Sequence, residues 1–157
     1  MKEIPLTQGQ VALVDNEDFE TLNQFKWCAQ WAPDAQTFYA QRREGKKIIY
    51  MHRKILDAPD RVKIDHRNHL GLDNQRSNLR FATGNQNQAN SRISKRNTSG
   101  FKGVSRYRKK ERWKAQISKN NRSIFLGYFN HPEQAARAYD AAALKYFGEF
   151  ACCNFPN

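Results

Sequence analysis

The sequence has little of what would anchor a chain in a membrane. No stretch approaches the roughly 18 consecutive apolar residues of a membrane-spanning helix, and the mean hydropathy is -0.91. The first ten residues, MKEIPLTQGQ, contain an acidic residue and two glutamines where an export signal would need an apolar core. We therefore expect a cytoplasmic location.

Cysteine is also scarce, with three in 157 residues. Cys152 and Cys153 are adjacent and Cys28 is distant, so the paired C-x-x-C spacing of a zinc site is absent. A few free thiols fit an intracellular chain better than a disulfide framework does. Neither zinc nor disulfides are expected to stabilise this fold.

Acidic residues are few, and they are fewest towards the end of the chain. The sequence holds 27 Lys and Arg against 15 Asp and Glu, a net charge of +12. Residues 1–94 carry 14 basic and 11 acidic side chains, whereas residues 95–157 carry 13 and 4. The excess of +9 favours the phosphates of a nucleic acid, although membranes and acidic proteins would also be attracted.

Chain length and the alternation of helical and strand patterns predict two small domains of the α+β class. The segment ISKRNTS is polar and basic, has no apolar periodicity, and is the expected linker. In the N-terminal part we expect strands over 11–14 and 38–40 and a helix from Asp18 to Phe25. The expected divisions are a scaffold (1–50), a central core (51–92), the linker (93–99) and a C-terminal domain (100–157).

The central core has the frame of a strand, a loop, a strand and a helix. A strand over 62–64 ends in two polar residues, and the following loop over 67–77 is rich in Asn, Asp and Gly. A return strand is expected over 78–83. Its last residue, Thr83, can cap a helix that begins near Gly84.

Four polar residues on this frame could hydrolyse a phosphodiester. His66 can act as a base, because a histidine with an ordinary pKa near 6.5 is largely neutral at physiological pH. Asp65 and Asn87 offer oxygen donors to Mg²⁺ or Mn²⁺. Asn78, at the start of the return strand, can tie the loop together through hydrogen bonds to the backbone.

The stretch IDHRNHLGLDNQRSNLRFATGNQNQAN resembles the HNH endonucleases, in particular the branch found in phage and intron-encoded homing enzymes. The resemblance implies a ββα-metal fold with His66 as general base, Asn78 as the central asparagine, and Asp65 and Asn87 as ligands of Mg²⁺ (or Mn²⁺). It also implies a bacterial or phage-infected host cell. Asn87 replaces the final histidine of the commonest pattern, which should weaken metal binding without abolishing it.

Other polar residues of the central core are assigned lesser roles. His69 lies inside the loop and His52 begins a short helix, so each is expected to be structural or solvent-facing. Arg80 could contact a phosphate, but an arginine on a strand is as often solvated.

The C-terminal domain has the pattern of three strands followed by a helix. The strands are expected over 101–108, 112–119 and 122–129, with Asn120-Asn121 as a two-residue turn. The helix is expected over 132–147, with Gly148 just past its end. Its buried face is predicted to contain Ala135, Tyr139, Ala142, Ala143 and Tyr146.

The sequence of this domain, GFKGVSRYRKKERWKAQISKNNRSIFLGYFNHPEQAARAYDAAALKYFGEFACCNFPN, is similar throughout to the APETALA/ethylene-response-factor DNA-binding domain. The matching motifs are K-G-V, W-x-A-x-I, L-G-x-F, A-A-x-A-Y-D-x-A-A and N-F-P. The resemblance implies a three-stranded antiparallel sheet packed on one helix, with the sheet in the DNA major groove.

Strand parity predicts which side chains of this sheet face the DNA. Trp113, Ala115 and Ile117 should pack on the helix, as should Ile124 and Leu126, while the residues between them face outward. Several outward positions hold residues other than the arginines and tryptophan of the plant members, so the target sequence cannot be transferred. The residues expected to contact DNA are Arg80, Lys102, Ser105, Arg106, Tyr107, Arg108, Lys114, Gln116, Ser118, Arg122 and Phe125.

These patterns together predict an HNH endonuclease of homing type that cuts double-stranded DNA as a monomer and nicks one strand. A regulator of transcription on a nuclease-like scaffold that no longer cuts is the first alternative. An RNA-binding protein is the second, because basic charge does not distinguish the two nucleic acids.

Overall fold

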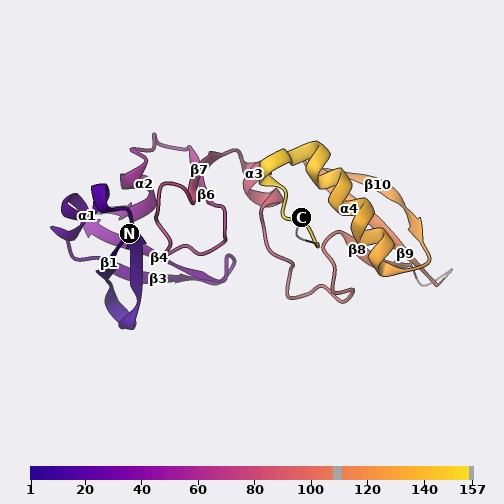
Figure 1. Cartoon of the computed structure of the whole chain (residues 1–157), viewed down its shortest axis with the longest axis horizontal. Coiled ribbons are helices and arrows are strands. Elements are labelled where there is room, and N and C mark those ends of the chain that lie inside the picture. Colours follow the sequence, from indigo (N-terminus) through magenta and orange to yellow (C-terminus); the bar gives the residue numbers. More distant parts are fainter. Residues whose placement is uncertain (108–110, 156–157) are drawn as a thin grey trace. The chain divides into compact units, whose positions relative to one another are not determined.

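The chain divides into two compact units, Met1–Thr83 and Gly84–Asn157. The computed structural model describes residues 1–107 and 111–155. Both units mix short sheets with helices, in agreement with the expected fold class (Figure 1). Within the described ranges, no helix combines the length and the apolar character that crossing a membrane requires.

The first unit contains three small antiparallel sheets, with strand orders β1-β2, β3-β4-β5 and β6-β7. Its elements are β1 (Lys2–Pro5), η1 (Thr7–Gly9), β2 (Val11–Val14), α1 (Asn16–Asn23), β3 (Cys28–Ala32), β4 (Thr37–Glu44), β5 (Lys47–Tyr50), α2 (Met51–Ile55), β6 (Lys63–His66) and β7 (Leu79–Ala82). The predicted strands and the helix near Asp18 are present. β1 and β3 were not predicted, because each buries a single residue and so shows no alternation in the sequence.

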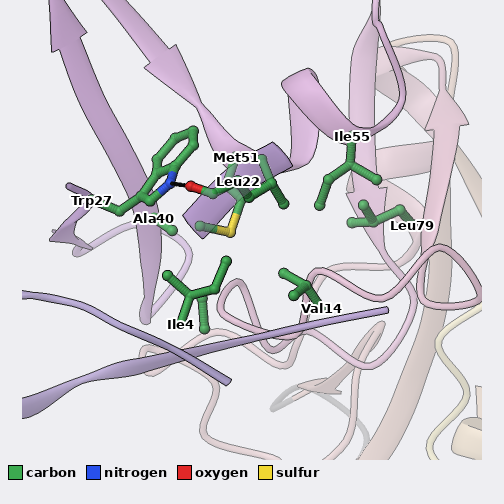
Figure 2. Close-up of a cluster of buried hydrophobic side chains, with 9 residues drawn as sticks. Ile4, Val14, Leu22, Trp27, Ala40, Met51, Ile55 and Leu79 are labelled. Carbon is green, nitrogen blue, oxygen red and sulfur yellow. Dashed lines mark hydrogen bonds between the residues drawn. The ribbon is translucent and has the colours of Figure 1, made fainter. Parts of the chain in front are cut away.

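The core of this unit collects apolar side chains from β1, β2, α1, β4, α2 and β7, together with Trp27, which lies between α1 and β3 (Figure 2). The indole nitrogen of Trp27 donates to the backbone oxygen of Leu22 at 2.9 Å, so the one polar atom of the buried ring is satisfied. Burying a side chain of the size of Leu, Ile or Met contributes about 1.5–3 kcal/mol. The buried members are Ile4, Ala12, Val14, Leu22, Trp27, Ala40, Met51, Ile55 and Leu79.

The second unit begins with α3 (Gly84–Ala89) and continues into an antiparallel sheet of order β10-β9-β8. The strands are β8 (Val104–Tyr107), β9 (Arg112–Lys119) and β10 (Arg122–Phe129), and the last two have the predicted bounds. Asn120 and Asn121 have φ of 50° and 60°, the left-handed conformation that a two-residue turn between twisted strands requires.

One long helix, α4 (Pro132–Phe147), covers one face of this sheet, as predicted. Its alanines at 135, 136 and 143 are almost fully buried, and such small side chains let the helix backbone lie close to the strands. Gly148 follows with φ of 53° and starts the short turn η3 (Gly148–Phe150). The predicted sheet-on-helix arrangement of the C-terminal part is therefore confirmed.

A buried carboxylate holds the end of the chain against α4. Asp140 accepts hydrogen bonds from the backbone nitrogens of Asn154 at 2.7 Å and Phe155 at 3.0 Å. The side chain of Asn154 in turn bonds both backbone groups of Lys102. The helix, the C-terminal segment and the start of β8 thus form one connected network.

The division between the units lies at Thr83 and Gly84, whereas the sequence placed a linker over 93–99. The ammonium group of Lys102 donates to the backbone oxygens of Ala89 and Ser91, both at 2.6 Å. These bonds attach α3 and the segment after it to the C-terminal sheet. Such contacts between distant residues leave no local sign in the sequence.

Gly103→Ala is expected to destabilise the second unit by about 3 kcal/mol. Gly103 has φ of +75°, and a Cβ there would collide with the ring of Tyr139, so strain and overpacking add. Gly100→Ala is the matched control, because Gly100 has φ of +79° but open space around it, and about 1 kcal/mol is expected. Urea unfolding followed by circular dichroism measures both, and equal losses would contradict the close packing of Tyr139 on Gly103.

Candidate functional site

Asp65 and His66 end β6, where its hairpin with β7 opens into a loop. Both side chains are buried, with 5% and 6% of their surface exposed. A buried carboxylate is costly unless it is paired. Arg80, opposite Asp65 in the strand register, supplies the partner through Nε and Nη2, at 2.8 and 2.7 Å from Oδ2. Arg80 therefore orients Asp65 and is buried, not solvated, while its expected contact with a phosphate stays a prediction.

Asn78 closes the β6–β7 loop (residues 67–78) from inside. Its Oδ1 accepts from the backbone nitrogen of Asn68 at 3.0 Å, and its Nδ2 donates to the backbone oxygen of Asp73 at 2.7 Å. The side chains of Asn68 and Asp73 are also bonded to each other, at 2.7 Å. The predicted bonds from Asn78 to the loop backbone are present, and they tie the end of the loop to its start and to its middle.

The middle of this loop is bonded to β2 and β4. The backbone nitrogen of Leu13 donates to Leu72 at 2.9 Å, and that of Asn74 donates to Leu13 at 2.8 Å. The nitrogen of Gly71 donates to the hydroxyl of Thr37 at 2.9 Å. A Cβ on Gly71 would come within 2.5 Å of the backbone of β4, so only glycine allows this close approach.

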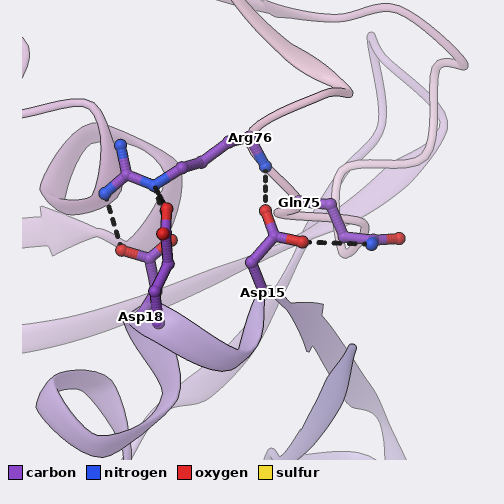
Figure 3. A network of polar contacts seen from close by, with 5 residues as sticks. Asp15, Asp18, Gln75 and Arg76 are labelled. Carbon is purple, nitrogen blue, oxygen red and sulfur yellow. Dashed lines mark hydrogen bonds and ion pairs between the residues drawn. The ribbon is translucent and has the colours of Figure 1, made fainter.

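The end of the loop is fixed to the start of α1 by a charged network (Figure 3). The Arg76 guanidinium donates to both carboxylate oxygens of Asp18, at 2.9 and 2.7 Å, and Glu17 lies 2.8 Å away. Asp15 accepts from the backbone nitrogen of Arg76 at 2.7 Å and from the amide of Gln75 at 3.3 Å. The loop is thus attached to the scaffold at its middle and at its end.

His66 is oriented by an asparagine that the sequence did not single out. Its Nε2 lies 3.4 Å from Oδ1 of Asn74, a residue with no exposed surface. Since an amide oxygen only accepts, this contact assigns the imidazole proton to Nε2 and the lone pair to Nδ1. Burial lowers the pKa of His66, more than the Asn74 hydrogen bond and the Asp65 charge raise it, so the ring is neutral at physiological pH.

A second histidine, His52, packs against His66. The two rings are 5.2 Å apart at an interplanar angle of 84°, and His52 also stacks on Tyr50 and meets the edge of Tyr39. Its Nδ1 is buried and has no hydrogen-bond partner. Burial and the neighbouring His66 lower the pKa of His52 to about 3. The sequence-based expectation of a structural or solvent-facing role thus left out its contact with His66, because α2 reaches β6 only in the folded unit.

Asn87, the other expected metal ligand, lies exposed on α3 in the second unit. Within the first unit Asp65 and His66 are neighbours at the end of β6, and Asn78 directly precedes β7, the strand paired with β6. His69, which has φ of 64°, is half-buried in the loop. Across residues 1–107 and 111–155, no group of three His, Cys, Asp or Glu side chains has the geometry to hold a metal ion.

The sheet of the second unit has an outer face that α4 does not cover. Trp113, Ala115 and Ile117 pack towards α4, as predicted. The expected contacts on the outer face are Ser105, Tyr107, Lys114, Gln116, Ser118 and Phe125, and the strand register places them together. Phe125 is the most exposed of the large apolar side chains on this face, at 54%.

The chain is similar to known proteins in two ways, one limited to the second unit and one along nearly its whole length. Residues 99–149 match the AP2 domain. The whole chain is similar to a protein of Acanthamoeba polyphaga mimivirus named as an uncharacterized HNH endonuclease, with 29% identity over 94% of this chain and 76% of the relative. Both resemblances noted in the sequence are thereby confirmed.

The AP2-like region is similar to an ethylene-responsive transcription factor and an AP2-like ethylene-responsive transcription factor, both of Arabidopsis thaliana. Each is 42% identical over 62 residues, which is 38% of this chain. The chain spans only 14% and 11% of the length of these plant proteins.

Three of the basic residues expected to contact DNA from the AP2-like sheet are placed elsewhere. Lys102 is engaged by two backbone oxygens, and burial lowers its pKa. Arg106 lies opposite Trp113, which packs towards α4. Arg122 lies opposite Lys119, whose ammonium group sits over the Tyr146 ring of α4. Both arginines are therefore on the helix side of the sheet. Arg108 lies outside the described residues.

Acid is expected to destabilise the first unit through His52. An unfolded chain protonates this ring near pH 6.5, whereas the folded unit keeps it neutral down to about pH 3. The stability that the neutral His52 ring provides is therefore fully present above pH 6.5 and is lost as the pH falls towards 3. At pH 5 the loss of unfolding free energy amounts to about 2 kcal/mol. His52→Phe should flatten this part of the profile, while replacing the exposed His131 with Gln should not. Urea unfolding between pH 4 and 7.5 measures the slopes, and parallel profiles would contradict the assignment.

Proposed function

We propose that this protein is a metal-dependent endonuclease of the HNH type that hydrolyses phosphodiester bonds in double-stranded DNA. The first unit cleaves, and the AP2-like unit holds the duplex. The observation that carries the proposal is that His66 is buried next to Asp65 and that its imidazole is neutral. Both residues end a strand of a hairpin whose loop is held by hydrogen bonds. The name of the viral relative supports the same reaction.

His66 is the proposed general base. Its Nδ1 accepts a proton from the attacking water, and Asn74 at Nε2 keeps the ring in the required tautomer. A base of this kind contributes roughly a hundredfold to ten-thousandfold in rate. Asn78 acts as a positioning residue, because its side chain is engaged by the loop backbone.

Asp65 is the proposed ligand of Mg²⁺ or Mn²⁺ in the first unit, and the resemblance to HNH enzymes implies the same role for Asn87, which belongs to the second unit. A carboxylate and an amide oxygen are donors that would suit such a hard cation. When bound, such an ion would stabilise the charge on the phosphate and on the leaving oxygen. Arg80 keeps the Asp65 carboxylate oriented. α3 starts two residues after β7 ends, which is the chain order of a ββα-metal arrangement.

Duplex DNA is the proposed partner of the second unit. Residues 84–157 carry 14 basic and 4 acidic side chains, a net +10, whereas residues 1–83 carry 13 and 11, a net +2. Counterion release by a chain of this charge favours binding to phosphates. The sequence contains one Asp-His pair, so a monomer of homing type would nick one strand at a time.

A second candidate is a DNA-binding regulator on a scaffold that no longer cuts. The plant relatives of the AP2-like region are named as transcription factors, which favours this reading. The two candidates differ in one observable. A regulator would bind duplex DNA in the presence of Mg²⁺ and leave it intact.

His66→Asn is expected to reduce cleavage by roughly a hundredfold or more while leaving DNA affinity nearly unchanged, because the amide cannot act as a base. His69→Asn is the matched control in the same loop and should cut normally, since asparagine tolerates the positive φ of that position. The substrate is a supercoiled plasmid bearing a site mapped beforehand by sequencing the ends of cut DNA. Open circles are the expected product, and wild-type cleavage by His66→Asn would remove His66 from the mechanism.

Removing divalent cations is expected to stop cleavage but not DNA binding. Excess EDTA should abolish nicking, and Mg²⁺ or Mn²⁺ should restore it, because the proposed ligands are oxygen donors. Electrophoretic mobility shifts in the same buffers report binding, which depends on the charge of the second unit. Undiminished cleavage in excess EDTA would contradict the metal assignment.

A further inference from the structure

Three aromatic rings form a continuous ridge on the outer face of the AP2-like sheet. Tyr128 of β10 lies between the others, with ring centroids 4.7 Å from Tyr107 of β8 and 4.9 Å from Phe125 of β10. Phe125 is 54% exposed and Tyr128 is 45% exposed. We refer to Tyr107, Phe125 and Tyr128 as the aromatic ridge.

A β-bulge places Tyr128 on this face. The register of β10 against β9 shifts between Phe125 and Gly127, so Phe125 pairs with Gln116 and Tyr128 with Lys114. In a regular strand, residues three apart point to opposite faces, and Tyr128 would face α4. Because of the bulge, Leu126 and Phe129 pack inward and both Phe125 and Tyr128 point outward.

The ridge lies beside polar side chains that suit the major groove of A·T-rich DNA. Gln116, directly opposite Phe125, has the amide that bonds the N6 and N7 edge of adenine. Arg106 and Arg122, which could read guanine, are on the other face of the sheet. Lys114 lies opposite Tyr128 and supplies a cation for the phosphates.

In a duplex the faces of the bases are stacked, so the apolar group that the major groove presents is the C5-methyl of thymine. The ring-to-ring distances exceed the rise of about 3.4 Å between neighbouring bases, so the ridge can reach over successive base pairs. Aromatic side chains make apolar contact with these methyl groups, whereas they offer little to a G·C pair.

We propose that the aromatic ridge packs on thymine methyl groups and, with Gln116, gives the AP2-like unit a preference for A·T-rich duplex DNA. This inference rests on the proposed function, in which the second unit binds duplex DNA, and on the major-groove placement of the sheet that the AP2 resemblance implies. The inference adds the class of DNA sequence that the outer face of the AP2-like sheet would prefer. It also assigns a role to Tyr128, which parity alone would place against the helix.

The test uses the full chain and a pool of randomised duplexes with fixed ends. A·T-rich sequences should be enriched, and the selected duplex is then resynthesised with deoxyuridine in place of thymidine, one position at a time. Removal of a thymine methyl that lies under the ridge should weaken binding by about fourfold. An unselected duplex, bound through its phosphates, should show the same affinity and salt dependence with either base.

Phe125→Ala should abolish the distinction between thymine and uracil near its position and keep the salt dependence of binding. Leu144→Ala is the matched control, because Leu144 is a 43% exposed apolar residue on α4. It should retain the distinction. Circular dichroism and thermal unfolding of both variants check that the fold is retained.

The outcomes separate this inference from the proposed function. A chain that binds no duplex at low salt would overturn both. Duplex binding that is indifferent to uracil, or selection of G·C-rich sequences, would overturn the ridge assignment and leave the proposed function standing. Tighter binding to single strands of the same sequence would also overturn it, since the rings would then be stacking on unpaired bases.

Discussion

The candidate site depends on the carboxamide of Asn78 more than on any other group. By bonding the backbone at Asn68 and at Asp73, it fixes a twelve-residue loop that has no regular structure of its own. The same loop carries Asn74 to His66 and presents Gly71 to β4. Without those two bonds, the loop would be more flexible, and its contacts with β2, β4 and α1 would have to offset a larger loss of conformational entropy. The histidine would then lose its fixed orientation.

The second unit has a small core, and it is stabilised by close packing of the helix on the sheet. Alanines on α4 and the bare backbone of Gly103 let helix and sheet approach closely, so few large side chains are needed between them. The buried Asp140 adds hydrogen bonds that join α4, the C-terminal segment and the residues before β8. Two rings of the aromatic ridge, on Phe125 and Tyr128, stay largely exposed on the outer face and take no part in this core.

Local signals in the sequence predicted much of this structure. The bounds of β9, β10 and α4 followed from alternation, a paired-asparagine turn and a proline and a glycine at the helix ends. Contacts between distant segments left no such signal. His52 against His66, Arg80 on Asp65 and Lys102 on Ala89 each require the fold to be known. The outward Tyr128 depends on a one-residue bulge, which reverses the parity that a sequence reading assumes.

The two units place their polar groups in opposite ways. In the first unit Asp65, His66, Asn74, Asn78 and Arg80 are all buried. Each of them bonds a partner, as groups removed from water must. Such groups have fixed positions, which chemistry at a single phosphodiester requires, but they offer little long-range attraction to DNA. The second unit carries a net charge of +10 and displays an exposed outer face. Under the proposed function, DNA affinity and bond cleavage are therefore expected to respond to substitutions in different units of the chain.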